Sequence, residues 1–149
     1  MTTNESLYRK DFHAWCFDQA KLIREKKFDD LDVENLAEEV ESVGKSEESE
    51  LESRLSLLIS HLLKWKYQPE RRCKSWIFTI KEQRRRVKKH LIKHPSLRHG
   101  LDGAFEDSYS DAVMRAEKET KLDIDTFPEQ MPFTQEEVMM DGWMPGDFL

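Results

Sequence analysis

Apolar side chains recur along the chain at spacings of three, four and seven residues, which is the period of amphipathic α-helices. The first segment with this spacing predicts one helix over about residues 5–26. Asp32 and the acids after it favour the start of a second helix, because carboxylates stabilise a helix N-terminus. The inward-facing side chains expected for it are Leu36, Val40 and Val43. Gly44 either ends this helix or lies inside it, and Ser46 offers a cap for a fresh start.

The most regular apolar stripe follows. It consists of Leu51, Leu55, Leu58, Leu62 and Trp65. This near-heptad spacing predicts a helix that faces the core along its length and ends before Pro69. Ser75 is the expected cap of the next helix, which runs to Pro95. Its inward-facing side chains are expected to be Trp76, Ile80, Val87 and Leu91.

Two more helices are expected in the last third of the chain. The first ends near residue 121, and its apolar side chains are Phe105, Tyr109, Ala112, Val113 and Ala116. After the loop-like stretch DTFPEQMPF, Thr134 followed three residues later by Glu137 predicts a capping box for a short last helix. Beyond that helix, three apolar side chains are expected to anchor the C-terminal segment: Trp143, Met144 and Phe148.

These patterns predict an all-α fold. The 149 residues are enough for one domain with a buried core, and the Val, Ile and Thr enrichment typical of strands is missing. We therefore expect a compact single-domain helical bundle over residues 1–149, with about five helices and a short C-terminal helix.

The chain shows no signal for a membrane or an oxidising compartment. No apolar stretch approaches the roughly 18 residues of a transmembrane helix, and the start MTTNESLYRKDF lacks the features of a signal peptide. Cys16 and Cys73 form no disulfide framework and are expected to be free thiols. The expected localisation is cytoplasmic.

Charge is distributed in blocks. Residues 1–63 carry 8 Lys and Arg against 15 Asp and Glu, residues 64–99 carry 13 against 2, and residues 100–149 carry 3 against 13. The basic block therefore lies between two acidic blocks in a chain whose net charge is −6. Such a pattern bears on the electrostatic potential around the protein and on its binding partners more than on its fold.

The basic block opens with the turn HLLKWKYQPERRCKSW, residues 61–76. Five of its residues are assigned a structural role: Trp65, Tyr67, Arg71, Arg72 and Trp76. The two tryptophans lie on the apolar stripes of their helices, and the two arginines follow Pro69, where guanidinium groups can donate to the carbonyls that end a helix.

A candidate binding surface follows on the next helix. The basic side chains assigned to this ridge are Lys81, Arg84, Arg85, Lys88, Lys89 and Lys93. Several of them share a helix face, so they could follow the phosphates of a nucleic acid or meet the carboxylates of an acidic protein. The alternative is that internal acidic residues neutralise them.

The sequence gives only weak signals for a metal site or a catalytic site. Glu34, Glu38 and Glu41 share a helix face, but that face lies opposite the apolar side chains and is expected to meet water. His90 and His94 have the spacing with which one helix can hold a metal, yet the sequence shows no third ligand. Cys73 lies among basic residues without a recognisable base. We therefore expect no metal, no cofactor and no catalytic residue.

Several motifs resemble the bacterial domain of unknown function (DUF) family 29. They are the opening DFHAWCFDQAKLIR, the centre LDVENLAEEVESVGKSE and the turn HLLKWKYQPERRCKSW. The likeness continues through FEDSYSDAVMRAEKET and FPEQMPFTQEEV, so it covers nearly the whole chain. The resemblance implies a small helical bacterial protein and implies no activity.

Three functional hypotheses remain. The first is a non-enzymatic binding module whose basic ridge, within residues 64–98, engages a polyanion or an acidic partner. The second is an acidic inhibitor or antitoxin-like protein that binds a basic protein partner. The third is a metal-dependent helical-bundle enzyme. The first requires exposed and unpaired basic side chains, the second requires those side chains to be paired internally, and the third requires His90 and His94 to converge with another ligand.

Overall fold

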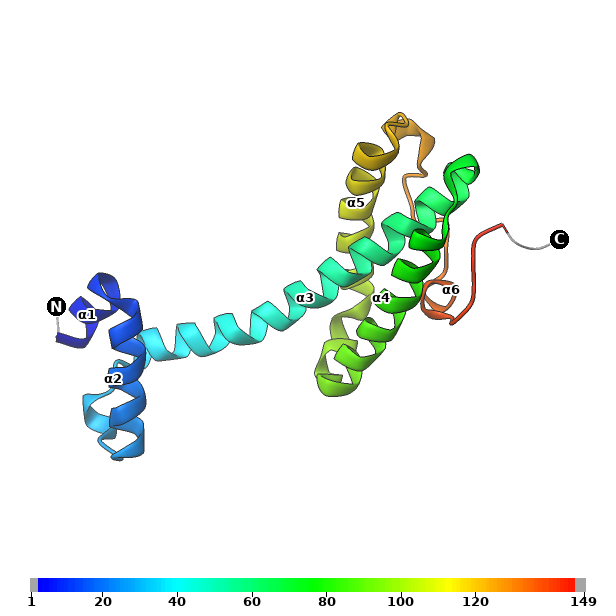
Figure 1. Cartoon of the computed structure of the whole chain (residues 1–149). Helices are drawn as coiled ribbons and strands as arrows, with labels where there is room; N and C mark the ends of the chain where they lie inside the picture. Colours follow the sequence, from blue (N-terminus) through cyan, green and yellow to red (C-terminus); the bar gives the residue numbers. More distant parts are fainter. Residues whose placement is uncertain (1–2, 147–149) are drawn as a thin grey trace. The chain divides into compact units, whose positions relative to one another are not determined.

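The computed structural model describes residues 3–146, with side chains from residue 7 onward. The described residues form six α-helices and no strand (Figure 1). The α-helices are α1 (Thr3–Lys10), α2 (Phe12–Arg24), α3 (Val33–Tyr67), α4 (Lys74–Lys93), α5 (Leu101–Thr120) and α6 (Gln135–Met139). Short 3-10 helices occupy Phe28–Asp30, Pro69–Arg71, Pro95–Gly100 and Ile124–Thr126. The all-α fold class is confirmed.

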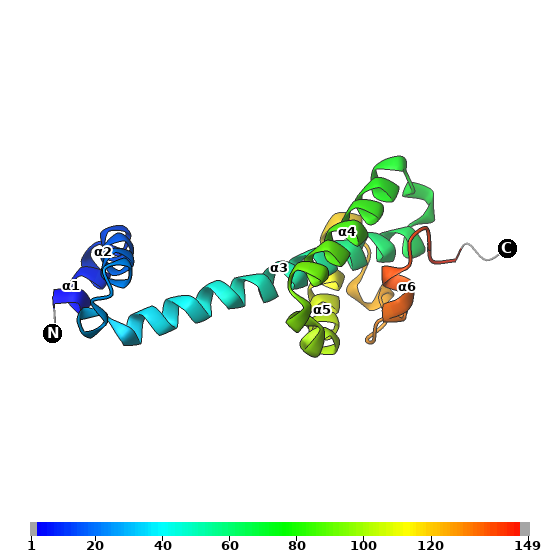
Figure 2. The same ribbon diagram turned by 90° about the horizontal axis from the view of Figure 1, so that it is seen from below.

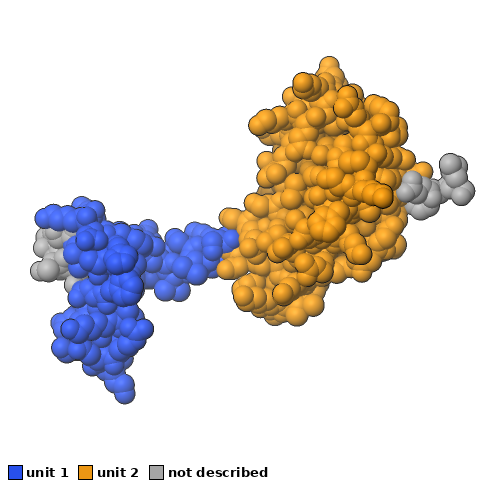
Figure 3. Space-filling model, viewed as in Figure 1, with its two compact units in different colours: residues 1–46 blue, residues 47–149 orange. Residues whose placement is uncertain are grey.

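The chain divides into two compact units, residues 1–46 and residues 47–149 (Figure 3). α3 contributes residues to both units, because it runs without interruption from Val33 to Tyr67. Gly44 and Ser46 therefore lie inside a helix. The Ser46 hydroxyl donates to the Val43 carbonyl at 2.6 Å and caps no new helix. That the chain unfolds as a single domain stays a prediction.

The first unit is organised around Trp15, which is buried between α2 and the start of α3. Its indole N–H donates to the Asp32 carboxylate at 3.0 Å, and the Asn35 amide donates to the same carboxylate at 2.8 Å. The buried Gln19 side chain accepts from the Asp32 backbone N–H at 2.8 Å. These bonds fix the position of Asp32, the residue immediately before α3.

Two expectations for this region are wrong. The predicted helix over residues 5–26 is broken at Asp11, because the Asp11 carboxylate accepts the backbone N–H of Ala14 at 3.0 Å and starts a new helix, α2. Val40 and Val43 do not face inward, since 69% and 67% of their surfaces are exposed.

The second unit holds the main core. All five residues of the stripe from Leu51 to Trp65 are buried, as predicted. The four leucines of the stripe pack with α4 and α5, which lie beside the C-terminal half of α3 (Figure 2). The inward-facing residues of α4 and α5 include Ile80, Val87, Leu91, Phe105, Tyr109, Ala112 and Ala116.

The ends of the later helices follow local chemistry. Cys73 precedes α4 and Ser75 lies in its first turn, so the prediction that Ser75 caps this helix is wrong. The capping box of α6 is confirmed: the Thr134 hydroxyl accepts from the Glu137 N–H at 3.0 Å, and the Glu137 carboxylate accepts from the Thr134 N–H at 2.9 Å. Trp143 and Met144 pack against the core, whereas Phe148 lies outside the described residues.

Among residues 3–146, no helix combines the length and the apolar character needed to cross a lipid bilayer.

The central position of Leu58 in the core gives a stability prediction. Leu58 is fully buried, so Leu58→Ala removes packed methyl groups and leaves a cavity, and we expect a loss of about 2–5 kcal/mol in the free energy of unfolding. The neighbouring Leu57 is only partly buried, and Leu57→Ala should cost less. Urea denaturation followed by circular dichroism measures both; a loss below about 0.5 kcal/mol for Leu58→Ala, the usual size of a surface substitution, would contradict the assigned core.

Candidate functional site

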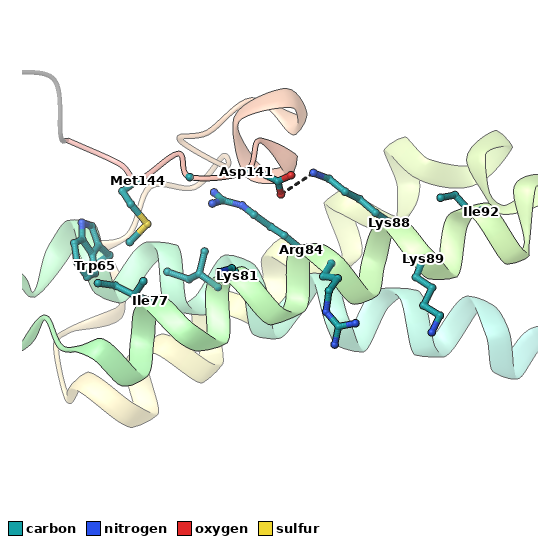
Figure 4. Close-up of a pocket in the computed structure, with 12 residues that line it drawn as sticks. Trp65, Ile77, Lys81, Arg84, Lys88, Lys89, Ile92, Asp141 and Met144 are labelled. Atoms are coloured by element: carbon teal, nitrogen blue, oxygen red, sulfur yellow. Dashed lines mark hydrogen bonds and ion pairs between the residues drawn. The ribbon is translucent and has the colours of Figure 1, made fainter.

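A groove runs along the outer face of α4, beside the C-terminal segment 141–144 (Figure 4). It has a volume of about 790 Å³. Its apolar lining is Trp65, Ile77, Ile80, Ile92 and Met144, and its polar lining is Lys81, Arg84, Arg85, Lys88, Lys89 and Asp141. From Ile77 to Ile92, at 1.5 Å per residue, the groove follows α4 for about 22 Å.

Four basic side chains of the predicted ridge are available to a partner. Lys81, Arg85, Lys89 and Lys93 are exposed, and no ion pair or hydrogen bond engages their side chains within the described part of the chain. The first three line the groove. They give its rim a concentrated positive charge.

Arg84 is not part of this exposed ridge, and its assignment as a surface ligand is wrong. Only 2% of its surface is exposed, and its guanidinium donates to the carbonyls of Val138 at 2.8 Å, Trp143 at 2.7 Å and Glu137 at 3.4 Å. Burial lowers the pKa of the guanidinium, and the nearby Asp141 carboxylate opposes that effect. Arg84 therefore attaches the C-terminal segment to α4.

Lys88 also differs from the expected ridge residue. Its ammonium donates to the Asp141 carboxylate at 2.8 Å, which ties the middle of α4 to the same segment (Figure 4). The hydrogen bond and the charge of Lys88 lower the pKa of Asp141. One of the basic side chains of the groove is thus already neutralised.

The floor of the groove offers apolar surface. Ile77 and Ile92 are 46% and 75% exposed, although they lie on a helix with a well-packed opposite face. Trp65 is buried, and no acceptor among the described residues meets its indole N–H. A buried donor without a partner costs free energy.

In the turn between α3 and α4, Arg72 and Tyr67 make internal contacts and Arg71 does not share them. Arg72 donates to the Trp65 carbonyl at 2.8 Å and lies over the Trp65 ring at 4.7 Å, whereas Arg71 is exposed at the end of a 3-10 helix. Tyr67 meets the ring of Phe127 edge to face at 5.5 Å. Arg72 therefore ties the turn to the end of α3.

Lys64, the first residue of the range predicted for the ridge, lies inside the protein. Its ammonium is 2.5 Å from the Glu119 carboxylate and 4.9 Å from the centre of the half-buried Trp76 ring. Burial and the charge of Lys64 lower the pKa of the neighbouring His61. Lys64 is therefore excluded from the exposed surface.

His90 and His94 have a third potential ligand that the sequence did not show. Within the described residues, the Glu47 carboxylate, His90 and His94 place three ligand atoms within 4.8 Å of one another. The buried His61 lies beside Lys64 and is not part of this cluster. Glu34, Glu38 and Glu41 are exposed, as predicted, and Cys73 is an exposed free thiol.

Sequence reasoning missed the apolar part of the groove. Ile77, Lys81, Lys88 and Ile92 recur at helical spacing on α4, so their shared face could have been recognised as a mixed apolar and basic surface. Asp141 and Met144 gave no such signal, because only the fold brings them to this helix.

Adjacent arginines provide a matched test of the assigned roles. Arg84→Met should lower the free energy of unfolding by about 2–3 kcal/mol, because it removes charge-assisted bonds to buried carbonyls. It should also speed amide hydrogen exchange in residues 134–146. Arg85→Met should change stability by less than about 0.5 kcal/mol, since the Arg85 side chain is exposed. Equal effects of the two substitutions would contradict the assignment.

No curated protein and no solved structure matches the chain. The family model described as "Domain of unknown function DUF29" matches residues 7–144, a range that contains α2 to α6 and every residue of the groove. The chain therefore belongs to the DUF29 family.

Proposed function

We propose that this protein is a non-enzymatic binding module that holds an acidic amphipathic helix of a partner protein in the groove along α4. The observation that carries the proposal is the combination of an exposed apolar floor with an unneutralised basic rim. Ile77 and Ile92 supply the floor, and Lys81, Arg85 and Lys89 supply the rim. An amphipathic helix offers apolar anchors every three or four residues and carboxylates beside them.

The length of the groove suits such a partner. About 22 Å accommodates four turns of helix, which present apolar side chains at positions i, i+4, i+7 and i+11.

A protein partner accounts for the groove better than a nucleic acid. Phosphates would use the basic rim but leave the isoleucines in water. Trp65 is buried and Trp76 is half-buried, so neither presents a free ring face for stacking with bases.

The inhibitor hypothesis receives less support. It required the basic residues to be paired internally, yet Lys81, Arg85, Lys89 and Lys93 have no ion pair within the described residues. Cytoplasmic localisation remains part of the proposal, and the two free cysteines support it.

Binding of a designed probe tests the proposed function. The probe is a fluorescently labelled twenty-residue peptide with leucines at helical spacing and glutamates between them. We expect the full-length protein to bind it, with an affinity that falls as salt is added because charge pairs at the rim are screened. Fluorescence anisotropy measures binding, with a scrambled peptide of the same composition, single-stranded RNA and duplex DNA as comparisons.

Variants of matched charge locate the surface. Lys81/Arg85/Lys89→Glu should weaken peptide binding by more than about tenfold, equivalent to 1.4 kcal/mol. Lys10/Lys21/Lys118→Glu makes the same change in net charge at exposed positions outside the groove and should have a much smaller effect. Ile77/Ile92→Ser should also weaken binding, because it removes the apolar floor. Equal binding of the scrambled peptide, tighter binding of RNA or DNA, or equal loss in both charge variants would refute the proposal.

A further inference from the structure

A second cluster of polar side chains lies where α3 meets α4. α3 contributes Glu47 and Glu50, and α4 contributes His90 and His94. His94 Nε2 is 3.3 Å from Glu47 Oε2, and His90 Nε2 is 3.7 Å from the same oxygen. The two imidazole rings lie 4.8 Å apart. Three side chains of metal-binding type thus point toward one small space.

Two of the three distances between these ligand atoms lie close to those of a tetrahedral metal centre. Bonds of about 2.0–2.2 Å to nitrogen and oxygen place neighbouring ligand atoms about 3.3–3.5 Å apart. The 3.3 Å separation between His94 and Glu47 falls in that range, and the 3.7 Å separation between His90 and Glu47 requires only a small contraction. His94 and Glu47 are partly exposed, with 28% and 38% of their side-chain surface accessible, so they have room to adjust.

Glu50 supplies the support that metal-binding histidines usually have. Its carboxylate lies 2.7 Å from His90 Nδ1, the ring nitrogen that does not face Glu47 and His94. A histidine ligand commonly donates its second N–H to a carboxylate, which fixes the ring and increases its basicity. Only 6% of the His90 side chain is exposed, so the ring is held in place.

The present partner of His90 Nε2 is the Glu47 backbone carbonyl, at 2.9 Å. With Nδ1 beside the Glu50 carboxylate, both ring nitrogens face acceptors. A divalent cation bound at Nε2 would break this hydrogen bond, because a metal–nitrogen bond of about 2.0–2.1 Å leaves no space for a carbonyl oxygen that lies 2.9 Å from the nitrogen in the same direction. Binding therefore requires the His90 ring or the Glu47 carbonyl to shift.

We propose that Glu47, His90 and His94 form a binding site for a divalent transition-metal ion such as Zn²⁺, with Glu50 as the positioning residue and water in the fourth position. The site would clamp α3 to α4 at a contact now made by hydrogen bonds and ion pairs. The cluster lies in a surface hollow that is also lined by four basic residues, Arg54, Arg86, Lys89 and Lys93. Their positive charges oppose the binding of a cation. Glu50 and Glu82 offset two of these charges through ion pairs with Arg54 and Arg86.

The sequence alone predicted no metal here, because His90 and His94 had no visible third ligand. Glu47 lies 43 residues from His90 and meets it only through the packing of α3 on α4. The third hypothesis of the sequence analysis required such a convergence. Metal binding by itself assigns no reaction to the protein, and the proposed function does not depend on it.

Zinc titration of the full-length protein, first stripped with a chelator, tests the site. Isothermal calorimetry should show one Zn²⁺ per chain, and the thermal midpoint should rise with the concentration of Zn²⁺ because the ion binds the folded state. The affinity should fall as the pH is lowered, since protons compete for the ligands. Cobalt substitution should give the intense visible absorption of a tetrahedral centre.

Single variants identify the ligands. His94→Ala and Glu47→Gln should each weaken zinc binding by at least about tenfold, and Glu50→Gln should weaken it by about 10–100-fold, the usual range for a residue that orients a ligand. His99→Ala is the matched control, because His99 is exposed in the 3-10 helix Pro95–Gly100 between α4 and α5 and lies outside the cluster. Circular dichroism checks that each variant is folded. Absence of stoichiometric binding, or binding unchanged in both His94→Ala and Glu47→Gln, would overturn the proposal.

Discussion

The buried guanidinium of Arg84 determines how the surface of the second unit is built. A charged group with only 2% of its surface exposed requires several acceptors, and here carbonyls of α6 and of the following turn supply them. These bonds set the C-terminal segment against α4. The segment then brings Asp141 to Lys88 and Met144 to the edge of the groove. Without this buried charge, the groove would lose one of its walls.

α4 serves four purposes with four faces. Ile80, Val87 and Leu91 enter the core, Arg84 and Lys88 hold the C-terminal segment, and His90 and His94 meet the acidic residues of α3. The remaining face carries Lys81, Arg85 and Lys89 beside exposed isoleucines. The basic block of residues 64–99, with 13 Lys and Arg against 2 Asp and Glu, is therefore explained only in part by folding. Its internal members satisfy carbonyls and carboxylates, and its external members remain available to a partner.

The sequence predicted the helices well because their periodicity and caps are local properties. The stripe from Leu51 to Trp65 and the capping box of Thr134 and Glu137 are examples. Prediction from the sequence failed where the position of a side chain depended on contacts between residues that are distant in sequence. Nothing near Arg84 distinguishes it from Arg85, yet one is buried against residues more than fifty positions away and the other is exposed. Glu47 became a partner of His90 and His94 for the same reason.

Isoleucine methyl groups offer the most direct test of the groove as a binding surface. The chain has isoleucines at 77, 80 and 92 in the groove, and exposed ones at 23 and 124 elsewhere. In NMR spectra of the methyl-labelled protein, addition of the acidic amphipathic peptide should shift the signals of Ile77, Ile80 and Ile92 and leave those of Ile23 and Ile124 unchanged. Shifts confined to Ile23 or Ile124, or no shift at saturating peptide, would contradict the assignment of the α4 groove as the site of partner binding.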